Sequence, residues 1–131
     1  MVTTLTDSKR TAIAEKLADM RAVQNLLIAN EQRFIQECNN DEIRDRFRHM
    51  LEDDQKNLGV LETAITQYGI QSEPSQETTQ MLQQAEKMMQ GSELSFYKKV
   101  FQHELLKHGQ AMSGIIIHKA AQKVGADVDA A

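Results

Sequence analysis

The stretch TAIAEKLADMRAVQNLLIANEQRFIQEC, residues 11–38, decides the fold. Apolar side chains recur in it every three or four residues, which is the spacing of one face of an α-helix. This series consists of Ile13, Leu17, Met20, Leu27, Phe34 and Cys38, with Gln24 and Glu31 in the same register. Thr6 or Asp7 is a suitable N-cap, so the first helix is predicted from about residue 7 to Cys38.

The rest of the sequence predicts three further helices. Asn39 is placed to cap a second helix, with Glu42 in the capping-box position, and Gly69 ends that helix. A short, polar third helix is predicted over roughly residues 75–90, with Pro74 at its first turn. The fourth helix is predicted to be capped by Ser92 and to end near residue 124, before a frayed tail at 126–131.

The fold class follows from this pattern and from the composition. Gly (6 residues) and Pro (1 residue) are scarce, and no stretch alternates apolar and polar residues as a strand does. Short connections make neighbouring helices antiparallel. We therefore predict an all-α, up-down antiparallel bundle of three long helices and one short helix, in a single domain over residues 1–131 with an ordered core of about 7–125.

Charge and cysteine content bear on partners and location. The formal net charge of −4 gives no electrostatic reason to expect DNA or RNA binding, so no nucleic-acid partner is predicted. Cys38 is the single cysteine, and the first residues lack the pattern of a signal peptide. The longest apolar run, Ile115–Ile117, is too short to span a bilayer. These features predict a cytoplasmic protein with no membrane contact.

Carboxylates and histidine on the apolar stripes suggest a metal site. Glu31 and Asp54 fall in register on the first and second helices, and Glu104 and His108 follow Phe101 on the fourth. Buried carboxylates require compensation, and helical bundles provide it with carboxylate-bridged metal pairs. Oxygen donors with one imidazole suit iron or manganese. Asp53 and His49 are weaker candidates for the same site.

A metal-free interpretation of the same residues stays open. Glu31 at the edge of its stripe can pair with Arg33, and Asp54 ends the acidic run Glu52-Asp53-Asp54, which is typical of a solvated face. His108 fits equally well as a hydrogen-bonded core histidine, while His103 is predicted to lie off the stripe. In this interpretation no cofactor is bound.

The methionines of the third helix predict a contact surface. Met81, Met88 and Met89 form most of its thin apolar side, and flexible methionine side chains adapt to varied partners. Three long helices and one short, thin helix cover the core incompletely, and exposed apolar surface marks an interface. A homodimer is therefore predicted, with another protein partner as a further option.

Several segments together resemble the YciE/YciF-type branch of the ferritin-like proteins. They are ANE at 29–31, IRDRFRHMLEDDQ at 43–55, LE at 61–62 with YG at 68–69, and HELLKHG at 103–109. The resemblance spans roughly residues 10–125 and implies a ferritin-like fold with metal ligands at Glu31 and Glu104. A role in stress response is implied by the resemblance alone.

The chain also departs from that family's pattern. The family's histidine on the second helix falls on Met50, the acidic residue before Glu104 falls on Phe101, and the family's last helix has no counterpart. A non-enzymatic, ferritin-like protein with a degenerate metal site, acting through dimerisation or protein partners, is therefore the expected function. The alternative is an iron or manganese carboxylate protein with oxidase or stress-related activity.

Overall fold

The computed structural model describes residues 2–130, with side chains described for 7–119 and 122–123. Its four helices are α1 (Val2–Glu37), α2 (Asp41–Tyr68), α3 (Gln76–Gln90) and α4 (Phe96–Ala130). Residues 2–130 contain no strand. The predicted all-α bundle of three long helices and one short helix is confirmed.

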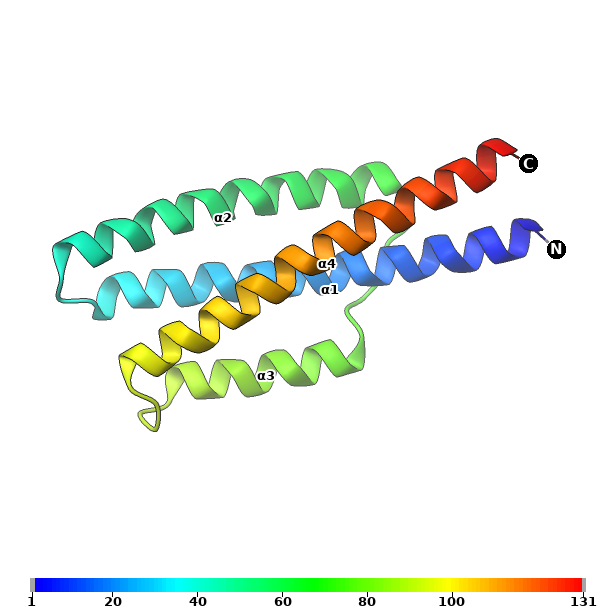
Figure 1. Ribbon diagram of the computed structural model, residues 1–131. Helices are drawn as coiled ribbons and strands as arrows, with labels where there is room; N and C mark the ends of the chain where they lie inside the picture. Colours follow the sequence, from blue (N-terminus) through cyan, green and yellow to red (C-terminus); the bar gives the residue numbers. More distant parts are fainter. Residues whose placement is uncertain (1, 131) are drawn as a thin grey trace.

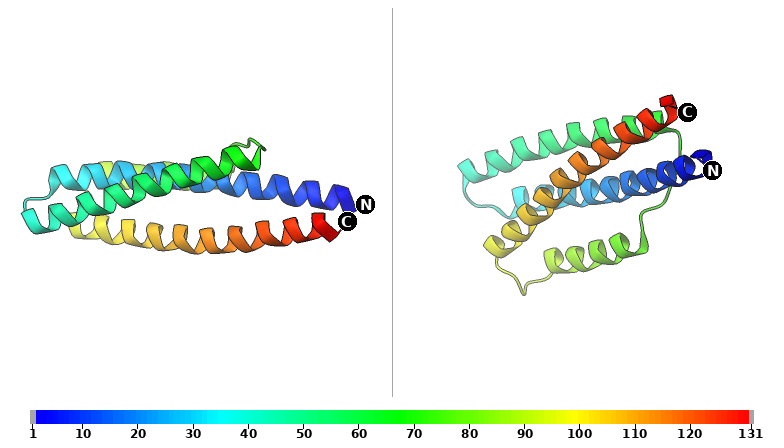
Figure 2. Two further views of the ribbon diagram at one scale, coloured as in Figure 1. Left: turned by 90° about the horizontal axis from the view of Figure 1, so that it is seen from above. Right: turned by 45° about the vertical axis from the view of Figure 1, so that its right-hand side comes forward.

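The helices run alternately in opposite directions, and α1 is central (Figure 1). It contacts each of the other three helices. Seen from above, α4 lies on one side of α1 and α2 (left panel of Figure 2), and it crosses α1 diagonally (Figure 1). The short α3 runs beside only part of α1 (Figure 1).

Side-chain caps and glycine set the helix ends. Asn40, rather than the predicted Asn39, caps α2, because its Oδ1 accepts a hydrogen bond from the Ile43 amide at 3.0 Å. Gly69 ends α2 with φ of 80°, a left-handed conformation that glycine adopts without strain. Ser95, rather than Ser92, caps α4, since its Oγ accepts from the Lys98 amide.

The outer ends of α1 and α4 extend beyond the predicted limits. α1 begins at Val2 instead of residue 7, and α4 continues through Gly125 to Ala130. A single glycine inside a helix costs only about 1 kcal/mol, so it does not force an end. The side chains of 124–131 lie outside the described residues, so the structure does not test whether the tail frays.

The core is divided into three layers along the bundle. One apolar layer packs Ile13 and Leu17 against α2 and α4. The other, at the opposite end of α1, is built on Phe34, Phe47 and Met89. Phe34 is fully buried, with its ring 5.3 Å from that of Phe47 and 5.7 Å from that of Phe96. Polar side chains fill the layer between them.

One buried carboxylate fixes the start of α3. Asp19 Oδ1 accepts a hydrogen bond from the Ser75 amide at 2.7 Å, and its Oδ2 accepts from Ser75 Oγ at 3.3 Å. Ser75 in turn caps α3 by accepting from the Thr78 amide. The first turn of α3 is therefore tied to the middle of α1.

None of the helices in the described part of the chain is both long and apolar enough to cross a membrane.

Candidate functional site

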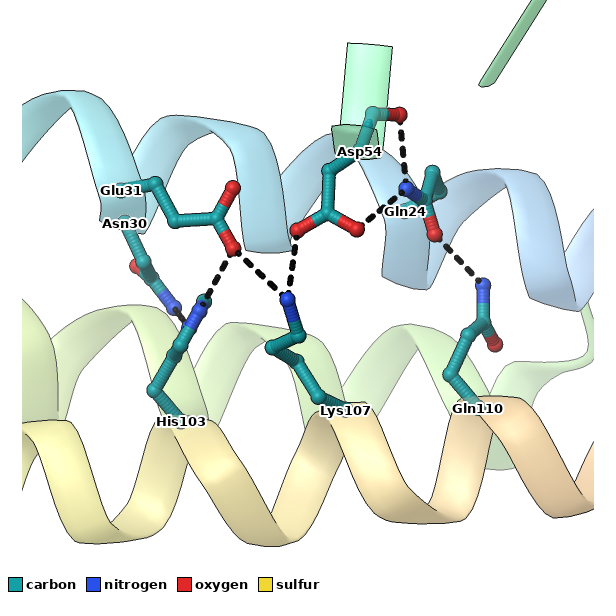
Figure 3. A network of polar contacts seen from close by, with 7 residues as sticks. All are labelled: Gln24, Asn30, Glu31, Asp54, His103, Lys107 and Gln110. Carbon is teal, nitrogen blue, oxygen red and sulfur yellow. Dashed lines mark hydrogen bonds and ion pairs between the residues drawn. The ribbon is translucent and has the colours of Figure 1, made fainter. Parts of the chain in front are cut away.

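The middle layer of the core is a network of polar side chains from α1, α2 and α4, shown in Figure 3. We call it the polar layer, and it consists of Gln24, Asn30, Glu31, Asp54, His103, Lys107 and Gln110. Polar groups are rare in a bundle core unless they are paired, so this layer is the strongest candidate for a specialised site.

A Glu–His pair lies at the centre of the polar layer. His103 Nε2 is 2.8 Å from Glu31 Oε2, and both side chains have an exposed fraction of 0%. The Asn30 amide nitrogen lies 3.5 Å from His103 Nδ1. Since Nδ1 accepts from this amide, Nε2 carries the hydrogen and donates to Glu31. The other Glu31 oxygen, Oε1, is buried without a hydrogen-bond partner.

Lys107 joins the two buried carboxyl groups. Its Nζ lies 3.0 Å from Asp54 Oδ2 and 3.5 Å from Glu31 Oε2. The Lys107 side chain is 25% exposed, so its ammonium is partly hydrated while it neutralises Asp54. A protein cation thus occupies the position between the carboxyl groups of α1 and α2.

Two glutamines complete the network. Gln24 Nε2 donates to the Asp54 carbonyl at 2.8 Å and to Asp54 Oδ1 at 3.3 Å. Gln110 Nε2 donates to the Met20 carbonyl at 2.6 Å and to Gln24 Oε1 at 3.3 Å. The polar layer therefore ties both α2 and α4 to α1.

Burial shifts the pKa values of the Glu–His pair in opposite directions. Burial, with the neighbouring Asp54 carboxylate, raises the pKa of Glu31 to about 9, and Lys107 opposes this only in part. Burial lowers the pKa of His103 to about 4, helped by the charge of Lys107. Both groups are therefore neutral at pH 7.

Asp54 behaves differently and stays charged. Burial alone would raise its pKa, but the interactions with Glu31 and Lys107 outweigh burial and lower the pKa. At neutral pH the layer thus contains one ion pair, Asp54 with Lys107, beside the neutral Glu31 and His103.

The structure brings together two of the four main residues predicted for the metal site. Glu31 and Asp54 are buried in the polar layer, whereas Glu104 and His108 lie on the exposed side of α4. The predicted register of α4 is therefore wrong, and His103, predicted to lie off the stripe, points inward instead. Asp53 and His49 are exposed on α2.

The signal for the correct register was present in the sequence. His103, Lys107, Gln110 and Gly114 are spaced by four, three and four residues, as required for one helix face. Large apolar residues also lie on the opposite side of α4, so apolar spacing alone does not distinguish the two faces. The polar groups on α1 and α2, which need partners, favour the face with Lys107.

The predicted methionine surface is only partly exposed. Met81 and Met88 are 45% and 43% exposed, while Met89 is buried at 3% in the layer around Phe34. Met89 is therefore a core residue of the bundle.

Comparison with known proteins gives one functional indication. The chain is 60% identical over all 131 residues to a protein of Nostoc sp. (strain PCC 7120) that is described as a DNA nickase. The chain spans 37% of the length of that curated relative. No protein-family profile matches the chain. No solved structure matches it either.

This similarity overturns several predictions. A ferritin-like protein with a degenerate metal site, its iron or manganese alternative and a stress-related role all conflict with a relative described as a DNA nickase. Among the described residues, no group of three or more His, Cys, Asp or Glu side chains is arranged to hold a metal ion. The all-helical fold itself does not test the ferritin-like resemblance, because many families share it.

The prediction of no nucleic-acid partner is also wrong in the light of this relative. It rested on the net charge of −4, which describes the chain as a whole. A whole-chain charge does not report what a larger assembly containing the chain binds. The homodimer stays a prediction, since no observation tests it.

Proposed function

We propose that the chain is a helical module of a DNA-nicking protein or assembly. The observation that supports this proposal is the 60% identity to the Nostoc DNA nickase, which extends over every residue of the chain. An identity this high over 131 residues preserves the fold and most of its contacts. The proposal concerns the module, because the match covers 37% of the relative.

Within this proposal, the polar layer positions the helices and does not react with DNA. Glu31 and His103 are fully buried, and a phosphodiester cannot reach them while the bundle is folded. Their neutral forms at pH 7 and their partners on α1 and α4 instead stabilise one arrangement of the helices. Strand cleavage is assigned to groups outside the polar layer.

A cytoplasmic location is part of the same proposal. The single cysteine agrees with a reducing compartment.

A segment exchange tests the proposal. The matching region of the Nostoc DNA nickase is replaced by this chain, and conversion of supercoiled plasmid to the open-circular form is measured. We expect the chimaera to nick at a rate within about tenfold of the parent, because the exchanged segment is 60% identical to the one that it replaces and keeps its fold. A matched chimaera carrying Leu27→Asp, which places a charge at a position 1% exposed, serves as the inactive control.

One outcome of this experiment would contradict the proposal. A chimaera that is as helical and as thermally stable as the parent but does not nick would show that this chain does not serve the nicking function.

A further inference from the structure

An apolar groove runs between α1, α3 and α4, with a volume of about 750 Å³. Its lining comes from residues 9–23 of α1, the start of α3 and residues 105–123 of α4. The main apolar contributors are Ile13, Met20, Val23, Leu106, Ile116 and Ile117. Ile116 is 64% exposed, so the groove presents apolar surface to solvent.

The groove exists because α3 is short. Asp19 holds Ser75, and with it the start of α3, beside the middle of α1. The part of α1 from Val2 to Ala18 continues beyond that point without α3 beside it (Figure 1). At 1.5 Å per residue this part is about 25 Å long. Among the described side chains the groove lining extends from Lys9 to Val23, which is about four turns of α1.

The shape of the groove suits another helix. Two packed helices leave a trough between them, and the side-chain ridges of a third helix fill such a trough. The second half of α4 also carries apolar residues on more than one side, with Met112, Ile115 and Ile116 all about half exposed or more. Helices that are apolar on all sides are normally buried on all sides.

The charge of the groove's rim indicates the chemistry of that helix. Lys16 and Lys123 line the groove, although the chain as a whole carries a charge of −4. Asp19 is the one carboxylate among the described lining residues. Both of its oxygens accept hydrogen bonds from Ser75, and one lies 3.9 Å from Lys16. The rim is therefore positive around an apolar floor.

We propose that this groove binds an amphipathic helix of a partner protein, with its apolar stripe on the groove floor and flanking Asp or Glu side chains against the lysines. The apolar stripe supplies most of the affinity, and the carboxylates set the orientation and the choice of partner. This inference does not depend on the DNA-nicking proposal.

The probe for the test is a fluorescein-labelled peptide of about 18 residues, long enough to fill the open part of the groove. Leucines at helical spacing form its stripe and glutamates form its flanks. A second peptide has lysine in place of each glutamate. Fluorescence anisotropy with the full chain is expected to show binding of the acidic peptide at least roughly tenfold tighter than that of the lysine peptide.

Two pairs of matched variants locate the site. Lys16→Glu with Lys123→Glu is compared with Lys56→Glu with Lys98→Glu, which changes the net charge equally at exposed positions away from the groove. Ile116→Asn is compared with Ile115→Asn, since Ile115 is 54% exposed on the adjacent position but does not line the groove. The first member of each pair is expected to weaken acidic-peptide binding about tenfold, and the second less than about twofold.

Several results would overturn the proposal. Equal binding of the two peptides, no binding of the acidic peptide, or equal effects within each pair of variants would each do so. Displacement of the acidic peptide by duplex DNA would assign the groove to nucleic acid. A dimer in sedimentation that Ile116→Asn dissociates and Ile115→Asn does not would assign it to a second copy of the chain.

Discussion

Glu31 and His103 form a buried pair whose protonation is linked to folding. The folded pKa of Glu31, about 9, lies above its ordinary value of 4.5, so Glu31 stabilises the fold below pH 4.5 and loses this contribution as pH rises toward 9. The folded pKa of His103, about 4, lies below 6.5, so its contribution is complete above pH 6.5 and is lost as pH falls toward 4. Between pH 4.5 and 6.5 the two groups change the free energy of unfolding in opposite directions, and their effects cancel.

The first prediction is a decline in stability above pH 6.5. The free energy of unfolding should fall there by up to about 1.4 kcal/mol per pH unit, because Glu31 alone gains a charge that the folded state excludes. Glu31→Gln should abolish this decline. Urea unfolding at pH 5.5, 7 and 8.5 measures it, with the exposed Glu37→Gln as control. A variant Glu31→Gln with the slope of the parent would refute this interpretation.

Lys107 is the cation on which the buried carboxylate of Asp54 depends. Their charged atoms are 3.0 Å apart, and Asp54 is 5% exposed. We predict that Lys107→Met lowers the free energy of unfolding by about 1–3 kcal/mol, because it leaves Asp54 charged and poorly paired. Chemical denaturation measures the change. Lys56→Met, at an exposed position of α2, should change it by less than about 0.5 kcal/mol, and equal effects would argue against the ion pair.

At the scale of the element, α3 depends on a single side chain of α1 for the position of its first turn. Asp19→Ala removes both acceptors of the Ser75 hydrogen bonds. We predict a loss of about 1–2 kcal/mol and faster hydrogen exchange confined to the first turns of α3. Hydrogen-exchange mass spectrometry measures this. The exposed Glu15→Ala is the control, and unchanged exchange in α3 with Asp19→Ala would contradict the assigned role.

The helices themselves were predictable because local chemistry marks their limits. Gly69 can adopt a left-handed conformation, and Ser75 and Asn40 have side chains that bond free amides, so sequence patterns locate these ends within one or two residues. The register of α4 was not predictable from apolar spacing. Phe101 and Ile115 on one side and Leu106 and Ile117 on the other make two faces nearly equivalent. Packing against α1 decides between them.

At the scale of the whole molecule, two apolar layers enclose the polar layer. Phe34 anchors one of them, and its ring also contacts the His103 ring at 5.2 Å. We predict that Phe34→Ala costs about 3–5 kcal/mol, because it leaves a cavity in a fully buried site. Thermal unfolding measures it. Tyr97→Ala, at a position 77% exposed, should cost less than about 0.5 kcal/mol, and similar losses for both would contradict the layered core.

Only half of the candidate site was predictable, because the sequence shows the buried carboxylates but not their partners. Glu31 and Asp54 are visible in the sequence as carboxylates in register, which predicts that each needs a partner. Several partners satisfy that need, including a metal ion, a lysine or a protonated pair. The choice of Lys107 and His103 depends on how α4 crosses α1 (Figure 1), which is a property of the assembled bundle and not of any one helix.

The start of α1 and the end of α4 lie at the same end of the bundle (Figures 1 and 2). A longer polypeptide that carries this bundle would therefore enter and leave the bundle at the same end. Such a unit can be inserted into a surface loop of a host domain without pulling the two sides of that loop apart. Any host sequence would then be held at one pole of the bundle, and the opposite pole, where α1 turns into α2, would project away from it.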